Sequence, residues 1–249
     1  MAGHSKWANI KHRKARQDAV KGKQWSKCSK AIMAAAKSGP DPDQNLGLRY
    51  AIDEARAVNM PKDTIEKAIK KGSGELNDGE EFHEIRYEGY GPNGVAIMVD
   101  CLTDNLNRTA PEIRKIFERS GGNMGVSGSV SFGFTQRGLI SLDLEQTTED
   151  QLMELALDAG AEDIQQSEDG WEVYTDPTSL HAVRVALEAG GLVIGSCKMT
   201  MIPSTTVECG GSSADKIVRL MDAFEDHEDV QKVWANFDIP EEDMARLGG

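Results

Sequence analysis

The residues best suited to chemistry lie at the start of the chain, where cations and aromatic rings alternate. Residues 1–37 hold ten lysines and arginines against the single acid Asp18, a formal charge of +9. Because the whole chain carries −13, the remaining residues carry −22. Cations neutralise phosphates, and aromatic rings beside them stack on exposed bases. The segment therefore predicts a nucleic-acid site whose candidate contacts are Lys6, Trp7, Lys11, His12, Arg13, Lys14, Arg16, Lys21, Lys23 and Lys27.

The two tryptophans of this segment receive different interpretations. An apolar stripe at helical spacing begins at Trp25 and continues through Cys28, Ile32, Met33 and Ala36. We therefore expect Trp25 to pack into a core, with the neighbouring lysines on the solvated face of the same helix. Trp7 belongs to no such stripe and stays a candidate for base stacking.

A second polar cluster, Thr103-Asp-Asn-Leu-Asn-Arg-Thr109, is expected between a strand and a helix. In its structural interpretation, Asn107 or Thr109 caps that helix. In its functional interpretation, Asn105, Asn107 and Arg108 form a secondary polar binding loop, with Arg108 facing a phosphate or a partner.

The sequence lacks the patterns typical of enzymes. It has no P-loop, no H-E-x-x-H and no G-x-S-x-G, and its three later histidines fall in separate predicted elements. Residues 89–94 read G-x-G-x-x-G, but they lead into a strand and contain Pro92, so they predict a hairpin turn. We expect a non-enzymatic protein with no catalytic residue, cofactor, metal site or small-molecule substrate.

Composition limits where the protein acts. No apolar run approaches the roughly 20 residues that a membrane span needs, and no signal peptide is evident. The four cysteines are widely separated and form no C-x-x-C, which favours small buried side chains in a reducing compartment. We expect a cytoplasmic protein that makes no membrane contact.

The elements that must position these residues follow from periodicity. Besides the helix of the Trp25 stripe, helices are predicted at residues 45–59 and 61–71, after a break at residues 38–43 that is rich in turn residues. Residues 1–78 thus form a basic N-terminal helical domain.

Beyond residue 78 the pattern alternates between strands and helices. Strands are predicted at 82–90, 95–102 and 129–134, with a helix at 110–120 and a flexible loop at 121–128. The order βαββαβ follows, with strands at 139–142, 163–166, 171–175 and 197–201 and helices at 148–158 and 177–189. A short strand at 205–209, a helix at 215–224, a strand at 230–236 and an acidic tail complete the chain.

The βαββαβ order is that of a ferredoxin-like unit, whereas each segment flanking it is too small to close a core alone. We therefore predict an α+β protein of three domains. Residues 79–135 and 204–249 together form a discontinuous α/β domain, and residues 136–203 form a ferredoxin-like domain inserted into it.

Several motifs resemble those of the YebC/PmpR family, of which the mitochondrial translational activator of cytochrome oxidase is a relative. They are Met1-Ala-Gly-His-Ser-Lys-Trp7, His12-Arg-Lys14, Gln17-Asp18, Tyr87-Glu-Gly-Tyr-Gly-Pro92, Thr103-Asp-Asn105 with Asn107-Arg-Thr109, Gly121-Gly122, Gly128-Ser-Val130 and Met201-Ile-Pro203. The chain departs from the family at two positions. Leu106 stands where the family usually has a second arginine, and Trp25 stands where it more often has phenylalanine.

The resemblance implies a helical domain and two α/β domains, without a catalytic residue. It also implies a DNA-binding transcriptional regulator of the bacterial cytoplasm or, alternatively, a ribosome-associated factor that aids translation through proline-rich stretches. On charge alone, an acidic body with a basic arm suits ribosomal RNA, because the body is repelled from surrounding phosphate. The acidic α/β domains offer a surface for a protein partner.

Overall fold

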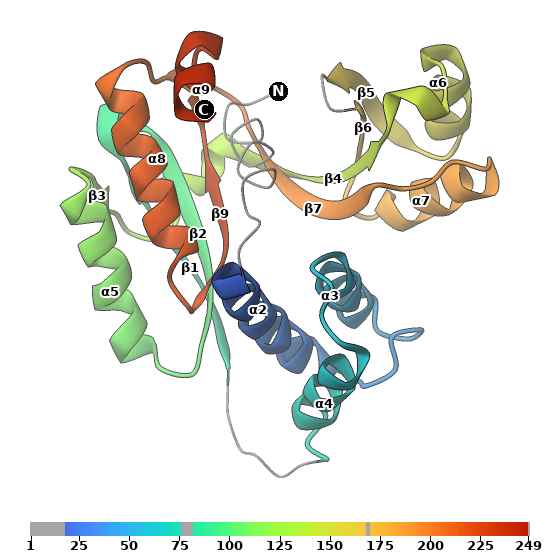
Figure 1. Ribbon diagram of the computed structural model, residues 1–249, viewed down its shortest axis with the longest axis horizontal. Coiled ribbons are helices and arrows are strands. Elements are labelled where there is room, and N and C mark those ends of the chain that lie inside the picture. The colour runs from blue at the N-terminus through green and yellow to red at the C-terminus, as the bar shows by residue number, and fades with distance from the viewer. Residues whose placement is uncertain (1–17, 76–81, 168–169, 249) are drawn as a thin grey trace. The chain divides into compact units, whose positions relative to one another are not determined.

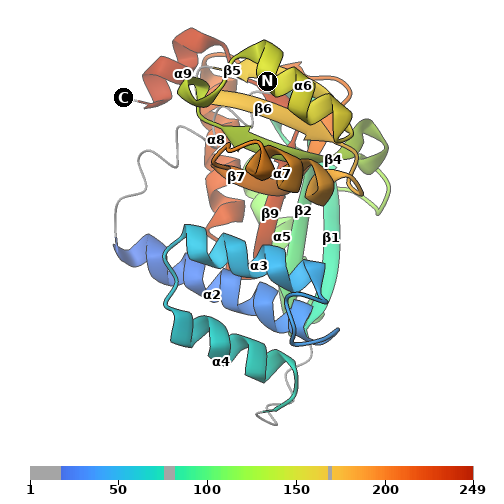
Figure 2. The ribbon, with the colours of Figure 1, turned by 90° about the vertical axis from the view of Figure 1, so that its right-hand side faces the viewer.

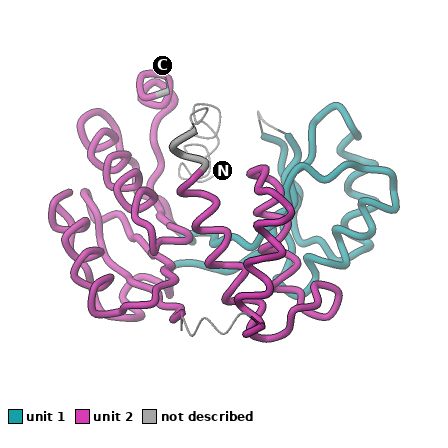
Figure 3. Tube along the Cα trace, turned by 60° about the horizontal axis from the view of Figure 1, so that its bottom comes forward, with its two compact units in different colours: residues 1, 133–204 teal, residues 2–132, 205–249 magenta. Residues whose placement is uncertain are grey.

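The computed structural model (Figure 1) describes residues 18–75, 82–167 and 170–248. It divides into two compact units: residues 133–204 form the smaller one, and the described parts of residues 2–132 and 205–249 form the larger one (Figure 3). Each unit combines helices with a four-stranded antiparallel sheet, which confirms the predicted α+β class. The boundaries of the three predicted domains stay a prediction.

Three helices open the larger unit: α2 (Asp18–Ala36), α3 (Leu46–Ala57) and α4 (Lys62–Gly72), with α2 between the other two (Figure 2). Side chains three and four positions apart share a helix face, so each helix contributes one apolar stripe. The stripes bury a common core of Ile32, Ala36, Leu48, Ala51, Ile52, Ala55, Met60, Ile65 and Ala68.

The helix boundaries follow local chemistry. The side chain of Asn45 accepts the backbone N–H of Leu48 (3.0 Å) and so caps α3. Pro61 immediately precedes the first turn of α4. A proline is tolerated there because the backbone N–H groups at the start of a helix have no hydrogen-bond partner within the helix. Helix α3 lies within the predicted range 45–59, and α4 agrees with the predicted range 61–71 to within one residue at each end.

A second core of the larger unit lies under its four-stranded sheet, in which each neighbouring pair is antiparallel. Helices α5 (Leu106–Arg119) and α8 (Ser212–Glu225) cover one face of this sheet (Figure 1). Chain segments that precede and follow residues 133–204 in the sequence therefore build one sheet. Its strands, in spatial order, are β3 (Asn123–Met124), β1 (His83–Tyr90), β2 (Ala96–Thr103) and β9 (Val230–Ala235).

The chain between β1 and β2 forms the short 3₁₀ turn η1 (Pro92–Gly94), which confirms the hairpin prediction for the G-x-G-x-x-G run. Two other predictions are wrong. Helix α5 starts at Leu106 instead of residue 110, and its cap is Asn105 instead of Asn107 or Thr109: the Asn105 side chain accepts the N–H of Arg108 at 3.1 Å. A cap three residues before the accepted N–H fits the geometry of a first helical turn.

Residues 129–134 are not a strand. The turn η2 (Ser131–Gly133) occupies this stretch, and β4 (Phe134–Leu142) begins where the predicted strand ends. The reason is Glu88 on β1, whose buried carboxylate accepts the backbone N–H groups of Gly128, Val130 and Ser131, each at 2.8 Å. N–H groups that bind one side chain cannot join a ladder.

The smaller unit contains the predicted βαββαβ order. Its spatial strand order is β5-β6-β4-β7, with all neighbours antiparallel, as in a ferredoxin-like sheet. Its elements are β4, α6 (Glu149–Asp158), β5 (Ala161–Ser167), β6 (Gly170–Thr175), α7 (Leu180–Ala189) and β7 (Ser196–Pro203), with the 3₁₀ turn η3 (Leu144–Gln146).

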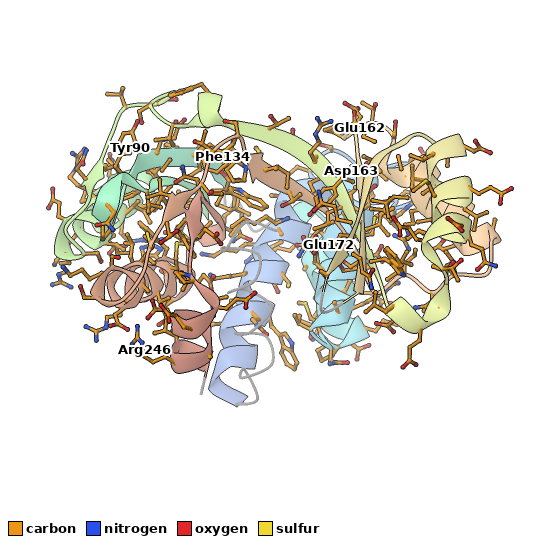
Figure 4. The ribbon with its side chains drawn as sticks, turned by 90° about the horizontal axis from the view of Figure 1, so that it is seen from above. Tyr90, Phe134, Glu162, Asp163, Glu172 and Arg246 are labelled. Carbon is orange, nitrogen blue, oxygen red and sulfur yellow. The ribbon has the colours of Figure 1, made fainter. Side chains whose placement is uncertain are left out.

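The C-terminal segment adds elements that the sequence analysis reduced to an acidic tail. These elements are the short strand β10 (Phe237–Asp238) and the helix α9 (Glu241–Gly248). Strand β10 pairs in parallel with β8 (Val207–Glu208), which lies within the short strand predicted at residues 205–209. Arg246 of α9, labelled in Figure 4, contacts Asp215 (2.8 Å) and Asp243 (2.9 Å). This pairing holds the last helix against the start of α8.

Candidate nucleic-acid interface

Most of the predicted nucleic-acid contacts precede the described part of the chain. Lys6, Trp7, Lys11, His12, Arg13, Lys14 and Arg16 lie outside the described residues. Lys21 belongs to α2, but its side chain lies outside the description. Lys23 and Lys27 are the two predicted contacts whose side-chain surroundings are described.

Trp25 packs inward, as predicted. Its ring lies against the core of the three helices, and its indole N–H donates to the carbonyl of Val58 at 3.1 Å. The indole therefore links α2 to the end of α3 and buries its polar edge with a partner.

Lysines on another face of α2 contact the turn between α8 and β9. Lys23, Lys27 and Lys30 are spaced by four and three residues, so they project from one side of the helix. We call these three residues the lysine face. Opposite them is the sequence Glu-Asp-His-Glu-Asp at residues 225–229, which we call the acidic turn.

The contacts between the two are short. Lys23 Nζ lies 3.1 Å from Asp226 Oδ1, and Lys27 Nζ donates to the Glu225 carbonyl at 2.6 Å. Lys30 Nζ donates to Asp229 Oδ1 at 2.8 Å and to the Glu228 carbonyl at 3.3 Å. Each lysine thus meets an oxygen of the acidic turn.

Asp229 is the centre of this contact. Its side chain is fully buried and accepts hydrogen bonds from Lys30, Arg108 (2.9 Å), Thr103 (3.2 Å) and Thr109 (2.8 Å). Burial alone would raise the pKa of Asp229, but the hydrogen bonds from Lys30, Arg108 and Thr109 outweigh it and hold that pKa far below its ordinary value. The aspartate is therefore ionised at neutral pH, and two cations and two hydroxyl groups donate to it.

This geometry locates the predicted secondary polar loop. Asn105 is occupied as the cap of α5, and Asn107 is exposed on its first turn. Arg108 turns toward carboxylates, with Asp104 at 3.1 Å, Glu228 at 3.7 Å and Asp229 at 2.9 Å. The loop therefore belongs to the same ionic network as the lysine face. Sequence reasoning missed Asp229, because one more acid in an acidic stretch gives no signal of burial.

Further ionic contacts join the three helices to the sheet. Lys232 of β9 lies 2.9 Å from Glu54 of α3. On the neighbouring strands, Arg86 makes a two-pronged contact with Asp100 (2.6 and 2.9 Å), and the Trp234 indole donates to the same carboxylate at 3.0 Å. The first of these contacts joins α3 to β9, and the others join the neighbouring strands β1, β2 and β9.

The loop anchored by Glu88 exposes two large apolar side chains, Val126 at 78% and Phe132 at 83%. The Tyr90 hydroxyl adds a further hydrogen bond to this loop at the Ser129 carbonyl (3.0 Å). Burial would raise the pKa of Glu88, yet the three backbone N–H groups lower it below its ordinary value, so the anchor stays charged.

Carboxylates of the smaller unit gather on strands β5 and β6, where Glu162, Asp163 and Glu172 are labelled in Figure 4. Glu162 pairs with Arg137, and Glu172 accepts the Tyr174 hydroxyl at 2.6 Å. Burial and then this hydrogen bond raise the pKa of Tyr174, so its hydroxyl stays protonated. Partners of this kind give the buried carboxylate a structural role.

Three further properties concern metal binding, membrane crossing and cysteine thiols. The described residues contain no group of three or more metal-binding side chains and no helix long and apolar enough to cross a membrane. All four cysteines are free thiols, and burial raises the pKa of Cys28 to about 11 and that of Cys101 to about 12. Protonated thiols are poor nucleophiles.

Comparison with known proteins covers nearly the whole chain. Residues 5–75 match a family model described as the TACO1/YebC protein N-terminal domain, and residues 82–237 match the TACO1/YebC second and third domain. A relative from Dictyoglomus turgidum is 52% identical over 249 residues, covering 99% of this chain and all of the relative. A relative from Geobacter sulfurreducens is 50% identical over 248 residues, with 99% and 100% covered. Both are named probable transcriptional regulatory proteins.

A solved structure agrees. The crystal structure of a conserved hypothetical protein from Aquifex aeolicus has a TM-score of 0.80 and 45% sequence identity, covering 90% of this chain and 93% of that one. The resemblance drawn from the sequence motifs is thereby confirmed. By family models, full-length relatives and fold, this chain belongs to the TACO1/YebC family, whose curated relatives are named as regulators of transcription.

Proposed function

We propose that this protein is a non-enzymatic, nucleic-acid-binding regulator that binds DNA through its basic N-terminal segment, residues 1–37. The observation that carries the proposal is the division of charge, +9 in this segment against −22 in the rest of the chain. Such a chain orients its cationic end toward a polyanion while the acidic body stays away from it. The names of the curated relatives support regulation of transcription, and we place this activity in the bacterial cytoplasm as part of the proposal.

The proposed contacts fall into two groups. Lys6, Trp7, Lys11, His12, Arg13, Lys14, Arg16 and Lys21 precede the lysine face, and we assign to them the primary phosphate contacts and base stacking. Lys23 and Lys27 also belong to the proposed site, although both contact the acidic turn in this structure. Asn105, Asn107 and Arg108 are a secondary contact at most, because Arg108 already faces three carboxylates.

The test is a quadruple variant in which Lys11, Arg13, Lys14 and Arg16 become alanine. If about five cations meet phosphates, the logarithm of the binding constant falls with the logarithm of salt concentration at a slope of about −4. The variant should lower both the affinity and the slope in fluorescence anisotropy with duplex DNA. An unchanged affinity would remove the N-terminal segment as the binding site.

Ribosomal RNA is the second candidate target, with a role in translation through proline-rich stretches. Two features favour it. Residues 38–249 carry a charge of −22, and the sequence shows no convincing helix-turn-helix whose recognition helix bears base-reading side chains. Phosphate contacts alone position a protein without reading sequence.

Crosslinking in cells, with DNA and RNA recovered from the same sample and sequenced, separates the two targets. Enrichment at discrete promoter segments supports the DNA regulator. Crosslinks concentrated in ribosomal RNA support the translation factor and make promoter binding a secondary consequence of the basic segment.

The acidic smaller unit suggests where a protein partner would bind. Residues 133–204 contain thirteen acids and three arginines or lysines, a formal charge of −10. We propose that a basic protein surface is the partner of this unit. Pull-down with the wild-type chain and with a variant neutralised on α6 would test it, and equal recovery would contradict it.

A further inference from the structure

The lysine face and the basic N-terminal segment belong to one continuous stretch of sequence. Helix α2 begins at Asp18, directly after the proposed primary contacts, and its lysines continue the same run of cations. A polyanion bound to residues 6–21 would therefore reach Lys23 within the next turn of helix, since each residue adds about 1.5 Å.

In this structure, oxygen atoms of the acidic turn already contact the lysine face. The acidic turn presents the Asp226 and Asp229 carboxylates and the Glu225 and Glu228 carbonyls to the three lysines. A nucleic-acid backbone offers the same chemistry, because its phosphate oxygens are anionic acceptors spaced along a strand. The acidic turn thus satisfies the lysine face as phosphates would.

The acidic turn keeps its shape independently of the lysines. His227 Nδ1 accepts the backbone N–H of Asp229 at 3.2 Å, and His227 Nε2 lies 3.0 Å from Glu112 of α5. Arg108, Thr103 and Thr109 hold the Asp229 carboxylate from the side of α5 and β2. Loss of the lysines would leave a folded turn.

The contact weakens from one end to the other. The Lys30–Asp229 pair is buried, with side chains 19% and 0% exposed, whereas the Lys23–Asp226 pair is open to solvent, at 61% and 74%. An exposed ion pair contributes little and is screened by salt, but a buried pair cannot lose one partner cheaply. Lys23 is the easiest of the three to release, and Lys30 is the hardest.

We propose that the acidic turn is an internal competitor of nucleic acid: it occupies a polyanion-binding face of α2, and bound nucleic acid displaces it from Lys23 and Lys27 while Lys30 keeps its bond to Asp229. The proposal rests on the proposed function, because it assigns a regulation to the same basic site. Its consequence is a lowered affinity for weakly charged or short polyanions, which cannot replace the oxygens of the turn.

Affinity measurements test the competition. The variant Asp226→Asn/Glu228→Gln removes two charges from the acidic turn and keeps Asp229. A matched control, Glu84→Gln/Glu208→Gln, removes two exposed charges elsewhere in the same unit. With a fluorescein-labelled duplex and a labelled RNA hairpin, the first variant should bind about threefold to fivefold more tightly than wild type. The control should bind within about twofold of wild type.

Zero-length carbodiimide crosslinking tests the displacement in the wild-type chain, because it joins lysines only to carboxylates in contact with them. Saturating duplex or hairpin should reduce the Lys23–Asp226 crosslink by at least about half, as a lysine bound to phosphate no longer faces the turn. Lys62–Glu66, a 3.6 Å pair within α4, is the internal control and should stay constant.

The outcomes separate this inference from the proposed function. A chain that binds neither probe contradicts the proposed function and the competition with it. Binding with equal gains in both double variants and an unchanged Lys23–Asp226 crosslink leaves the function standing and overturns the competition. A selective gain in the acidic-turn variant, together with loss of the crosslink, supports the competition.

Discussion

The acidic turn and the acidic smaller unit carry the same kind of charge in opposite settings. In the acidic turn, Asp229 is fully buried between Lys30 and Arg108. In the smaller unit, thirteen acids face three cations, and carboxylates such as Glu154 and Asp158 on α6 are exposed. Asp229 is neutralised inside the chain, whereas exposed acids such as Glu154 and Asp158 face solvent and are accessible to another molecule.

The difference teaches how to interpret net charge. A formal charge of −22 outside residues 1–37 suggests that this whole part of the chain repels nucleic acid. Part of that charge, however, is neutralised by lysines of α2 that form ion pairs with the acidic turn. The smaller unit carries −10 of this charge, and Lys23 and Lys30 pair with part of the remaining −12. Variants that disturb the two settings should differ accordingly, and the following predictions start with the largest expected effect.

Asp229→Ala should be the most damaging change. It leaves two cations without their carboxylate in a buried site, and breaking such a pair costs about 3–5 kcal/mol of the free energy of unfolding. Urea unfolding followed by circular dichroism measures this loss. Asp226→Asn, in the same turn but exposed, should change it by less than about 0.5 kcal/mol. Similar losses in both variants would contradict the contrast between buried and exposed pairs.

The pH dependence of stability gives a second readout of Asp229. Because its folded-state pKa is lowered, the folded protein favours the ionised form more than the unfolded chain does. The stabilisation is fully present above the unfolded pKa of about 4 and is lost progressively as the pH falls from there toward the folded pKa. Urea midpoints measured from pH 7 to pH 3 should fall less in Asp229→Ala than in wild type.

Glu88→Ala should follow in magnitude. The carboxylate accepts three backbone N–H groups, and each donor left without a partner in a buried site costs about 1–3 kcal/mol, reduced where water can enter. We expect a loss of about 2–4 kcal/mol and faster proteolysis at residues 125–132. Glu88→Gln keeps the size of the side chain and one acceptor oxygen, so it should lose less than Glu88→Ala. An equal loss in the two variants would contradict a contribution from the remaining acceptor oxygen.

The sequence predicted those elements whose cause is local. The apolar stripes of α2, α3 and α4 follow from helical periodicity, and β5 and β6 also lie near their expected positions. The strand expected at residues 129–134 failed because Glu88, forty residues away, captures its N–H groups. Such a contact leaves no trace in the local pattern.

The candidate site divides in the same way. Residues 1–37 stand out by composition alone, and the inward position of Trp25 follows from its stripe. The role of Arg108 did not follow, because its partner Asp229 is 121 positions away and looks like any other acid. Pairing between distant charged residues has no periodicity, so only the folded chain reveals it.

Trp25→Phe should have a modest effect. Phenylalanine keeps the apolar contact with the helical core but loses the indole N–H bond to the Val58 carbonyl, a contribution of about 0.5–1.5 kcal/mol. Thermal unfolding should show a small decrease in the midpoint. Trp25→Ala, which also removes the ring, should cost about 3–5 kcal/mol if the site behaves as a core position. Equal losses for phenylalanine and alanine would contradict the anchoring role of the ring.

The smallest effect is expected in the smaller unit, where Glu154→Gln/Asp158→Asn removes two exposed charges from α6. Because these substitutions leave no buried cation without its carboxylate, the free energy of unfolding should change by less than about 0.5 kcal/mol. Its affinity for duplex DNA should stay near that of wild type, unlike that of Asp226→Asn/Glu228→Gln. If both double variants gained affinity equally, overall repulsion would explain the result and the acidic turn would have no special place. If only the acidic-turn variant gained, its contact with the lysine face would set the affinity.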